Sequence, residues 1–182
     1  MALDKDVRTL LTETKAGDKI TESADYQMVF HEMEKIAAAD SDNIQAVWLG
    51  DIDANVLTQS DGFTSDSSFE ITERAWYRAV ETDSTILTSV YVDASTGNLI
   101  LSAAAPVYDE NGKNIIGVAG ADIALDHIDE LLPAYKIGNN GFVILVTSDG
   151  TIIYHPDSDN QLKNLSELNV SDSVMKAIQS QN

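Results

Sequence analysis

The side chains best suited to recognition chemistry stand in one short run and at one distant position. The run RAWY contains Arg74, Trp76 and Tyr77, and Asp122 stands between apolar residues of the later run GADIA. A guanidinium offers a planar fork that matches a carboxylate, and an indole N–H can donate to the same group. An unpaired Asp122 would be costly to bury, which favours a specific partner such as a ligand ammonium. One cation and one anion at opposite ends of a cleft would suit a zwitterion.

Structural interpretations of the same residues stay open. Trp76 and Tyr77 can pack in the core, and Arg74 can form a surface ion pair with Glu70 or Glu73. If neighbouring side chains satisfy both charges, no cleft lies between them. The chain would then be a ligand-free structural or protein-interaction module.

Other kinds of functional site lack their residues. The chain has no cysteine, which excludes disulfides, thiolate zinc sites and thiol catalysis. The run 51–55 imitates the start of a calcium loop, but Val56 stands where glycine is needed and Gly62 where a bidentate glutamate belongs. The three histidines are scattered, and no phosphate loop, nucleophile elbow or kinase motif occurs. The sequence therefore predicts neither an enzyme nor a bound cofactor.

The composition fits a globular protein with a strongly acidic surface. Of the 182 residues, 43% are hydrophobic and 23% charged, and 30 Asp and Glu against 11 Lys and Arg give a net charge of −19. Such a surface repels phosphate backbones and anionic lipid, so nucleic acid is excluded as a partner. No apolar run approaches the roughly 20 residues of a membrane span, and no signal peptide opens the chain.

Helices are predicted first, followed by strands. Leu3–Lys15 has apolar residues at helical spacing and ends before Gly17, and a second helix begins after Ser23 or Asp25. Its apolar stripe comprises Tyr26, Val29, Phe30, Met33, Ile36 and Ala37. A third, short helix is predicted over Glu70–Glu81.

Five strands are predicted around these helices, and Asn-Gly at 111–112 is a strong hairpin signal between the last two. The strands are 44–48, 56–58, 86–92, 99–107 and 115–123. The order indicates an α+β fold, with an antiparallel sheet of about five strands and helices against it.

A second unit follows the sheet. We predict a short helix over Asp126–Leu132 that stops at Pro133, and then two strands, 142–147 and 151–154, joined by a tight turn. Two strands cannot bury a core alone, so this unit is expected to be incomplete.

Four runs in the first unit, RAWYRA, YVDASTG, AAPVYD and GVAGADI, resemble the double Cache (dCache) sensor domains in their order. The later runs GFVIL and DGTIIYHP resemble the opening of that family's second module. The resemblance covers most of residues 20–165.

The resemblance implies two PAS-like sheets on a long N-terminal helix, outside the membrane. Residues 1–19 would be the remnant of that helix, 20–135 the membrane-distal ligand-binding module, and 136–182 the truncated start of the proximal module. The parent would be a membrane-anchored chemoreceptor or sensor histidine kinase, paired as a homodimer through its helix.

Family members that bind amino acids carry an aromatic residue, an Arg-x-Trp-Tyr run, a later tyrosine and a distant aspartate. These positions fall on Phe69, Arg74, Trp76, Tyr77, Tyr91 and Asp122. Phe69 departs from the pattern, because the family has tyrosine there and phenylalanine lacks the hydroxyl. Tyr91 is also open to a plainer interpretation, as a strand residue with its hydroxyl in water. The expected ligand is a small solute, an amino acid first, with an amine, an organic acid or a purine as the alternative.

Overall fold

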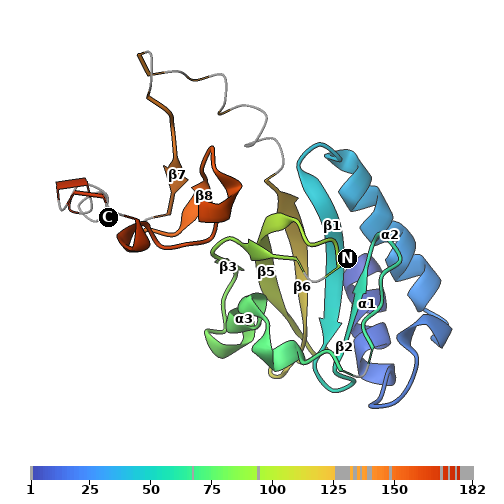
Figure 1. The fold of residues 1–182 in the computed structure, drawn as a ribbon. Helices are drawn as coiled ribbons and strands as arrows, with labels where there is room; N and C mark the ends of the chain where they lie inside the picture. The colour runs from blue at the N-terminus through green and yellow to red at the C-terminus, as the bar shows by residue number, and fades with distance from the viewer. Residues whose placement is uncertain are drawn as a thin grey trace.

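The fold is built on one antiparallel sheet. The computed structural model describes residues 2–66, 68–93, 95–125, 132, 135, 137–138, 141–147, 149–168, 170–171, 173–174 and 176. Within these ranges the sheet has six strands, with β2-β1-β6-β5-β3 in order (Figure 1) and β4 paired with β5 as β3 is. Its strands are β1 (Ile44–Asp51), β2 (Val56–Gln59), β3 (Ile86–Leu87), β4 (Tyr91–Val92), β5 (Leu99–Tyr108) and β6 (Ile115–Ala124). The predicted α+β class with an antiparallel sheet is confirmed.

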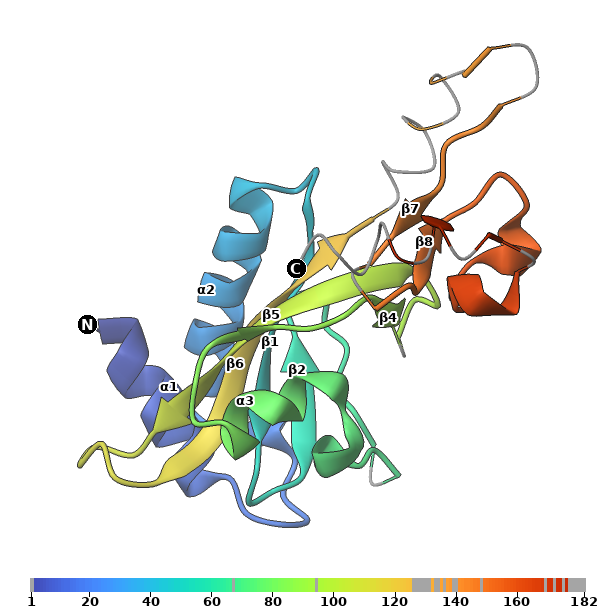
Figure 2. The ribbon, with the colours of Figure 1, turned by 90° about the vertical axis from the view of Figure 1, so that its left-hand side faces the viewer.

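Two helices cover one face of this sheet, α1 (Ala2–Glu13) and α2 (Tyr26–Ala39), joined through the 3₁₀ turn η1 (Ile20–Glu22) (Figure 2). Both were predicted from their apolar spacing. Leu10 of α1 and Val29 and Met33 of α2 are buried with Leu49 of β1 in one hydrophobic cluster. Burial of such side chains holds the helices on the sheet, because each fully buried side chain contributes roughly 1.5–3 kcal/mol of hydrophobic free energy.

The opposite face carries the polypeptide that holds the predicted site. The helix predicted over 70–81 is in fact three short pieces, η2 (Ile71–Glu73), η3 (Ala75–Tyr77) and α3 (Arg78–Glu81). The break falls at Arg74, which has an extended backbone (φ −83°, ψ 142°) between the two 3₁₀ turns. The break separates Ile71 from Trp76, and both are buried in the hydrophobic cluster on this face.

The strand predicted over 86–92 is also interrupted. The hydroxyl of Thr88 accepts the backbone N–H of Ser102 at 2.8 Å, in place of a main-chain carbonyl. The ladder therefore stops after β3 and resumes as β4, and both pieces pair with β5. This is why the sheet has six strands rather than about five.

The later unit contains a two-stranded sheet, β7 (Leu145–Val146) and β8 (Ile152–Tyr154), with the 3₁₀ turns η5 (Ser158–Asn160) and η6 (Leu165–Glu167). Both strands are shorter than predicted. They lie on the far side of the six-stranded sheet from α1 and α2 (Figures 1 and 2). Nearly all of the helix predicted over 126–132 lies outside the described residues.

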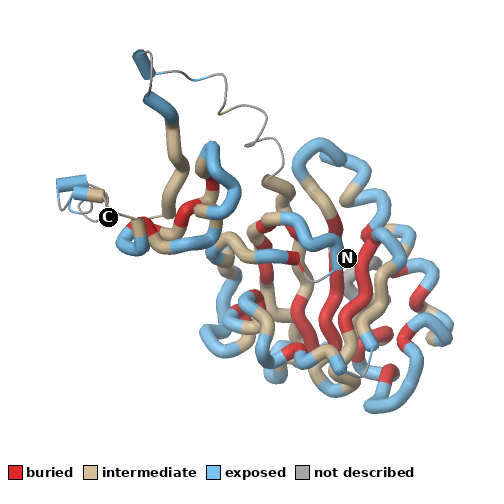
Figure 3. The backbone as a smooth tube through the Cα atoms, viewed as in Figure 1, coloured by how far each residue is buried: buried red, intermediate tan, exposed pale blue. Residues whose placement is uncertain are grey.

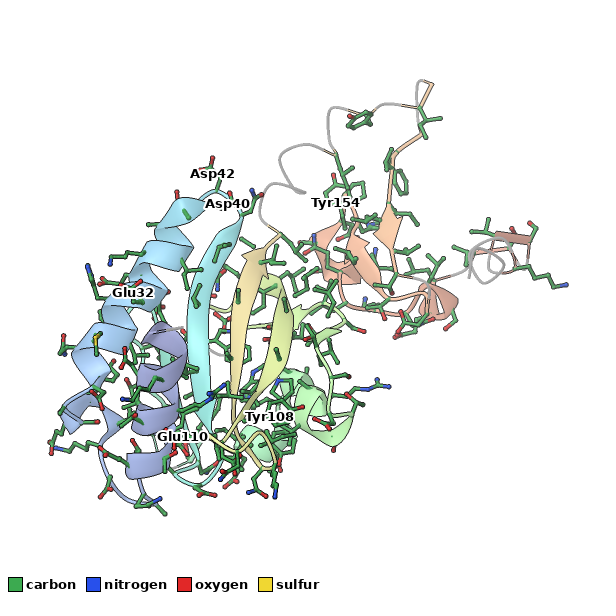
Figure 4. The ribbon with its side chains drawn as sticks, turned by 180° about the vertical axis from the view of Figure 1, so that it is seen from behind. Glu32, Asp40, Asp42, Tyr108, Glu110 and Tyr154 are labelled. Atoms are coloured by element: carbon green, nitrogen blue, oxygen red, sulfur yellow. The ribbon has the colours of Figure 1, made fainter. Side chains whose placement is uncertain are left out.

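Buried residues concentrate along the strands of the large sheet and on the inner sides of the helices (Figure 3). Within the described chain the acidic residues Asp51, Asp93 and Asp122 are also buried, and other acidic side chains lie outside this core. Glu32, Asp40 and Asp42 stand on α2 and the turn after it (Figure 4). None of the described helices has the length and apolar character that a bilayer span requires.

Candidate functional site

A small cavity lies on the face of the sheet opposite α1 and α2, and five of the predicted site residues line it. Its volume is about 20 Å³. The lining residues are Trp48, Leu57, Gln59, Phe63, Phe69, Arg74, Trp76, Tyr91, Asp93, Ser95 and Asp122. This volume holds about one water molecule, whereas small-molecule sites span roughly 300–1,000 Å³. A ligand of amino-acid size therefore enters only if the lining side chains move apart.

Strand register brings the buried carboxylate of the site against a tryptophan. Asp122 on β6 pairs with Ala46 of β1, and Trp48 on the same face of β1 pairs with Gly120. The Trp48 indole N–H donates to Oδ1 of Asp122 at 2.8 Å. Residue 120 must be glycine, because a Cβ there would overlap the indole ring of Trp48. Glycine at position 120 therefore leaves room for the Trp48 ring, whose N–H orients Asp122.

A second hydrogen bond reaches Asp122 from the other neighbouring strand. Ser102 on β5 pairs with Asp122, and its hydroxyl donates to the same Oδ1 at 2.5 Å. The Tyr91 hydroxyl oxygen lies 2.6 Å from Oγ of Ser102. Because Ser102 already donates its hydroxyl proton to Asp122, Tyr91 is the donor of this second bond. The Tyr91 hydroxyl meets a serine here rather than water. Among the described residues none donates to Oδ2 of Asp122, which leaves this oxygen for a ligand.

The electrostatics of Asp122 follow from its burial. Only 2% of its surface is exposed. Loss of hydration raises the pKa of its carboxyl to about 6, while the hydrogen bonds from Ser102 and Trp48 act in the lowering direction. Burial also raises the pKa of Tyr91 to about 12, so its phenol keeps its proton at neutral pH.

The cationic side of the cavity is formed by Arg74, whose guanidinium lies 4.5 Å from the centre of the Phe69 ring. Within the described part of the chain Arg74 has no carboxylate partner, and the surface pairing with Glu70 or Glu73 does not occur.

Trp76 belongs both to the hydrophobic core and to the lining of the cavity. It is buried, with its ring 4.6 Å from that of Trp48, and it also lines the cavity. No described residue accepts a hydrogen bond from its indole N–H.

Tyr77 is the one predicted residue that the structure does not bring to the cavity. It is partly buried and packs against the hydrophobic cluster that contains Trp48 and Trp76. Its position next to Trp76 places it on the same turn, η3, but outside the lining.

Several lining residues were not found from the sequence. Trp48 was assigned only to a strand, Gln59 only to a polar loop and Asp93 only to a turn. Ser102, which holds Asp122, was likewise an ordinary strand residue. The alternation of β1 places Ala46 and Trp48 on one face. Their pairing with Asp122 depends on which strands are neighbours, and the sequence carries no local signal for that.

Asp93 lines the cavity, but its own loop occupies its carboxylate. Oδ2 accepts from Gln45, from the hydroxyls of Ser95 and Thr96 and from the Thr96 backbone, and Oδ1 accepts from the Ser95 backbone. Burial by itself would raise the pKa of Asp93, yet these hydrogen bonds outweigh it and lower the pKa. Asp93 is therefore ionised at neutral pH and satisfied.

Metal chemistry has no support in the described ranges, where no three His, Cys, Asp or Glu side chains gather in a way that could hold an ion.

Comparisons with known proteins point to the same family as the sequence motifs do. The profile of the Cache domain family matches residues 5–181. The methyl-accepting chemotaxis protein PscA of Pseudomonas syringae pv. tomato is 34% identical over 128 residues, which are 70% of this chain and 20% of that protein. The chain thus spans about a fifth of the length of this relative.

Two solved structures are similar over most of the chain. The ligand-binding domain of the Pseudomonas aeruginosa amino acid chemoreceptor PctC, in complex with GABA, matches with TM-score 0.63 and 28% identity, covering 92% of this chain and 70% of that one. The ligand-binding domain of the Pseudomonas fluorescens chemoreceptor CtaA, in complex with L-valine, matches with TM-score 0.59 and 27% identity, covering 91% and 68%.

Proposed function

Because the chain belongs to the Cache domain family, as a ligand-binding domain of the bacterial chemoreceptor kind, we propose that it senses a free amino acid. The bound molecule contacts Arg74 through its carboxylate and Asp122 through its ammonium. One observation carries this proposal. The same cavity contains a guanidinium without a carboxylate partner among the described residues and a buried carboxylate with one oxygen unbound.

The charges of the cavity favour a zwitterion over an organic acid. Asp93 and Asp122 line it together with a single cation, Arg74. A ligand carrying only carboxylates would be repelled by two aspartates, in a protein of net charge −19.

The donors of the cavity that have no acceptor among the described residues argue against a simple amine as the ligand. Arg74 and the Trp76 N–H need an acceptor once a ligand displaces water, and an amine supplies none. An α-amino acid meets both demands. Phe69 supports the guanidinium by its ring face and adds no hydroxyl to the set.

The relatives suggest the setting of this domain. We place residues 20–135 as the membrane-distal, ligand-binding module and residues 136–182 as the start of the proximal one. The parent protein is a membrane-anchored receptor, a chemoreceptor or a sensor histidine kinase, with this domain outside the cytoplasm and paired as a homodimer. Binding shifts the population of two arrangements of the domain, since the contracted cavity and the occupied one cannot be the same state.

A thermal-shift and calorimetric screen tests the proposal on the purified chain. The probes are the twenty common L-amino acids, matched amines and organic acids, and purines. A ligand at a hundredfold excess over its dissociation constant stabilises the fold by about 2.7 kcal/mol. We expect at least one amino acid to raise the melting temperature, and its decarboxylated amine to have no effect.

Variants of two neighbouring arginines sharpen the test. Arg74→Ala should abolish the shift, and Arg74→Lys should retain little of it because a bidentate fork becomes a point charge. Arg78→Ala, an exposed arginine on α3, is the matched control and should bind as wild type. If amines act alone and Arg74→Ala changes nothing, the carboxylate half of the site is wrong. If no small molecule binds, the protein-interaction alternative replaces the proposal.

A further inference from the structure

Gln59 brings an unsatisfied amide to the cavity. It is the last residue of β2, only 3% exposed, and part of the cavity lining. Its Oε1 is buried and has no hydrogen-bond partner among the described residues. Its backbone is fully engaged, since the N–H donates to Phe63 and the carbonyl accepts from Gly62. The backbone at Gln59 is therefore fixed, while its amide oxygen has no donor within the part of the chain that the structure describes.

A buried acceptor without a donor destabilises a fold, so its retention at a binding cavity points to a partner supplied from outside. The other acidic group of the lining is already engaged by its own loop, because Asp93 accepts five hydrogen bonds from Gln45, Ser95 and Thr96. Among the described residues no donor reaches Oδ2 of Asp122, Oε1 of Gln59 or the hydroxyl oxygen of Tyr91, so these acceptors of the lining stay open to a ligand.

We propose that Gln59 accepts a hydrogen bond from the ammonium of the bound amino acid and makes the site selective for primary over N-methylated ammonium groups. This inference rests on the proposed function. A primary ammonium has three N–H donors, which Asp122, Gln59 and the Tyr91 oxygen can share. Each methyl group removes one donor and adds bulk to a cavity of about 20 Å³.

Replacing Gln59 by methionine tests this role, because methionine has a similar length and no amide. Gln59→Met should weaken L-alanine and L-valine binding roughly tenfold to a hundredfold, as expected for a lost hydrogen bond to a charged group. The same variant should raise the melting temperature of the unliganded protein, because the buried orphan acceptor is gone. A purely structural role would give the opposite sign for stability. Gln27→Met, at an exposed position of α2, is the control and should change neither quantity.

N-methyl-L-alanine and N-methyl-L-valine complete a cycle with the two parent amino acids. In wild type, N-methylation of the ligand should weaken its binding at least tenfold. In Gln59→Met this loss of affinity should be smaller, because the variant lacks the acceptor for the N–H that methylation removes. If wild type binds the parent amino acids and Gln59→Met keeps both affinity and penalty, the role of Gln59 is wrong and the proposed function stands. If neither parent amino acid nor any other binds wild type, the proposed function itself fails.

Discussion

The Trp48 indole N–H donates to Oδ1 of Asp122 at 2.8 Å, although the two residues are 74 positions apart in the chain. Together with the Ser102 hydroxyl, this bond occupies one carboxylate oxygen of a residue that lines the cavity, and among the described residues the other oxygen has no donor. The carboxylate is thus held in position before any ligand arrives, which reduces the conformational entropy lost on binding.

Trp48→Phe removes the indole donor and keeps an aromatic ring. We expect the pKa of Asp122 to rise above about 6, because one of the two hydrogen bonds that favour its charged form is lost. Amino-acid affinity at pH 7 should fall about tenfold. Titration of the side-chain carboxyl by NMR measures the pKa directly. Trp76→Phe is the paired control, since it removes an indole N–H that does not contact Asp122 and should leave this pKa in place.

Asp122→Asn should make the unliganded protein more stable at neutral pH. The folded pKa of about 6 lies above the ordinary aspartate value of 3.8, so between these values the folded state binds more protons than the unfolded state. Stability therefore falls as pH rises through this window, and above it the charged form costs on the order of 3 kcal/mol. Asparagine avoids this cost and still offers an oxygen to Trp48 and Ser102.

Urea unfolding at pH 4, 5, 6 and 7 checks this prediction. The variant should gain stability at pH 7 and little at pH 4, and its dependence on pH should become shallower. Some dependence should persist, because burial also raises the pKa of Asp51 to about 6. Glu110→Gln removes one exposed charge and serves as control (Figure 4). Equal gains at all four values would contradict the assignment to Asp122.

Amino-acid binding should weaken in acid. In the proposed site the ligand ammonium needs the ionised form of Asp122, and in the unliganded protein that form declines below pH about 6. The apparent dissociation constant should therefore rise about tenfold per pH unit below this value. Calorimetry at pH 7.5, 6.5 and 5.5, in buffers of different ionisation enthalpy, gives both the affinity and the proton released on binding. A flat profile in wild type would place the ammonium away from Asp122.

The local parts of this structure were predictable from the sequence, and its non-local parts were not. The hairpin predicted from Asn-Gly at 111–112 is confirmed, since this turn joins the two ten-residue strands β5 and β6. A tight turn pairs the two strands that flank it in the sequence, so its signal is local. The position of β1 between β2 and β6 has no local signal, so the contact of Trp48 with Asp122 was not predicted.

The same division holds within the site. Phe69, Arg74, Trp76, Tyr91 and Asp122 were predicted from the family pattern and share the cavity. Gln59 was missed, because the sequence predicts it at the start of a polar loop, where an amide is normally exposed, and only the folded chain shows that it is buried.

Gly120→Ala should show how closely the site depends on the Trp48 ring. A Cβ at position 120 would overlap the indole, which must then tilt and loosen its bond to Asp122. We expect a loss of about 1–3 kcal/mol in stability, as for other overpacked positions, and weaker amino-acid binding. In a Trp48→Val background there is no ring to displace, so Gly120→Ala should cost much less stability there. Urea unfolding of the four proteins of this cycle measures the coupling, and strictly additive losses would mean that residue 120 is glycine for another reason.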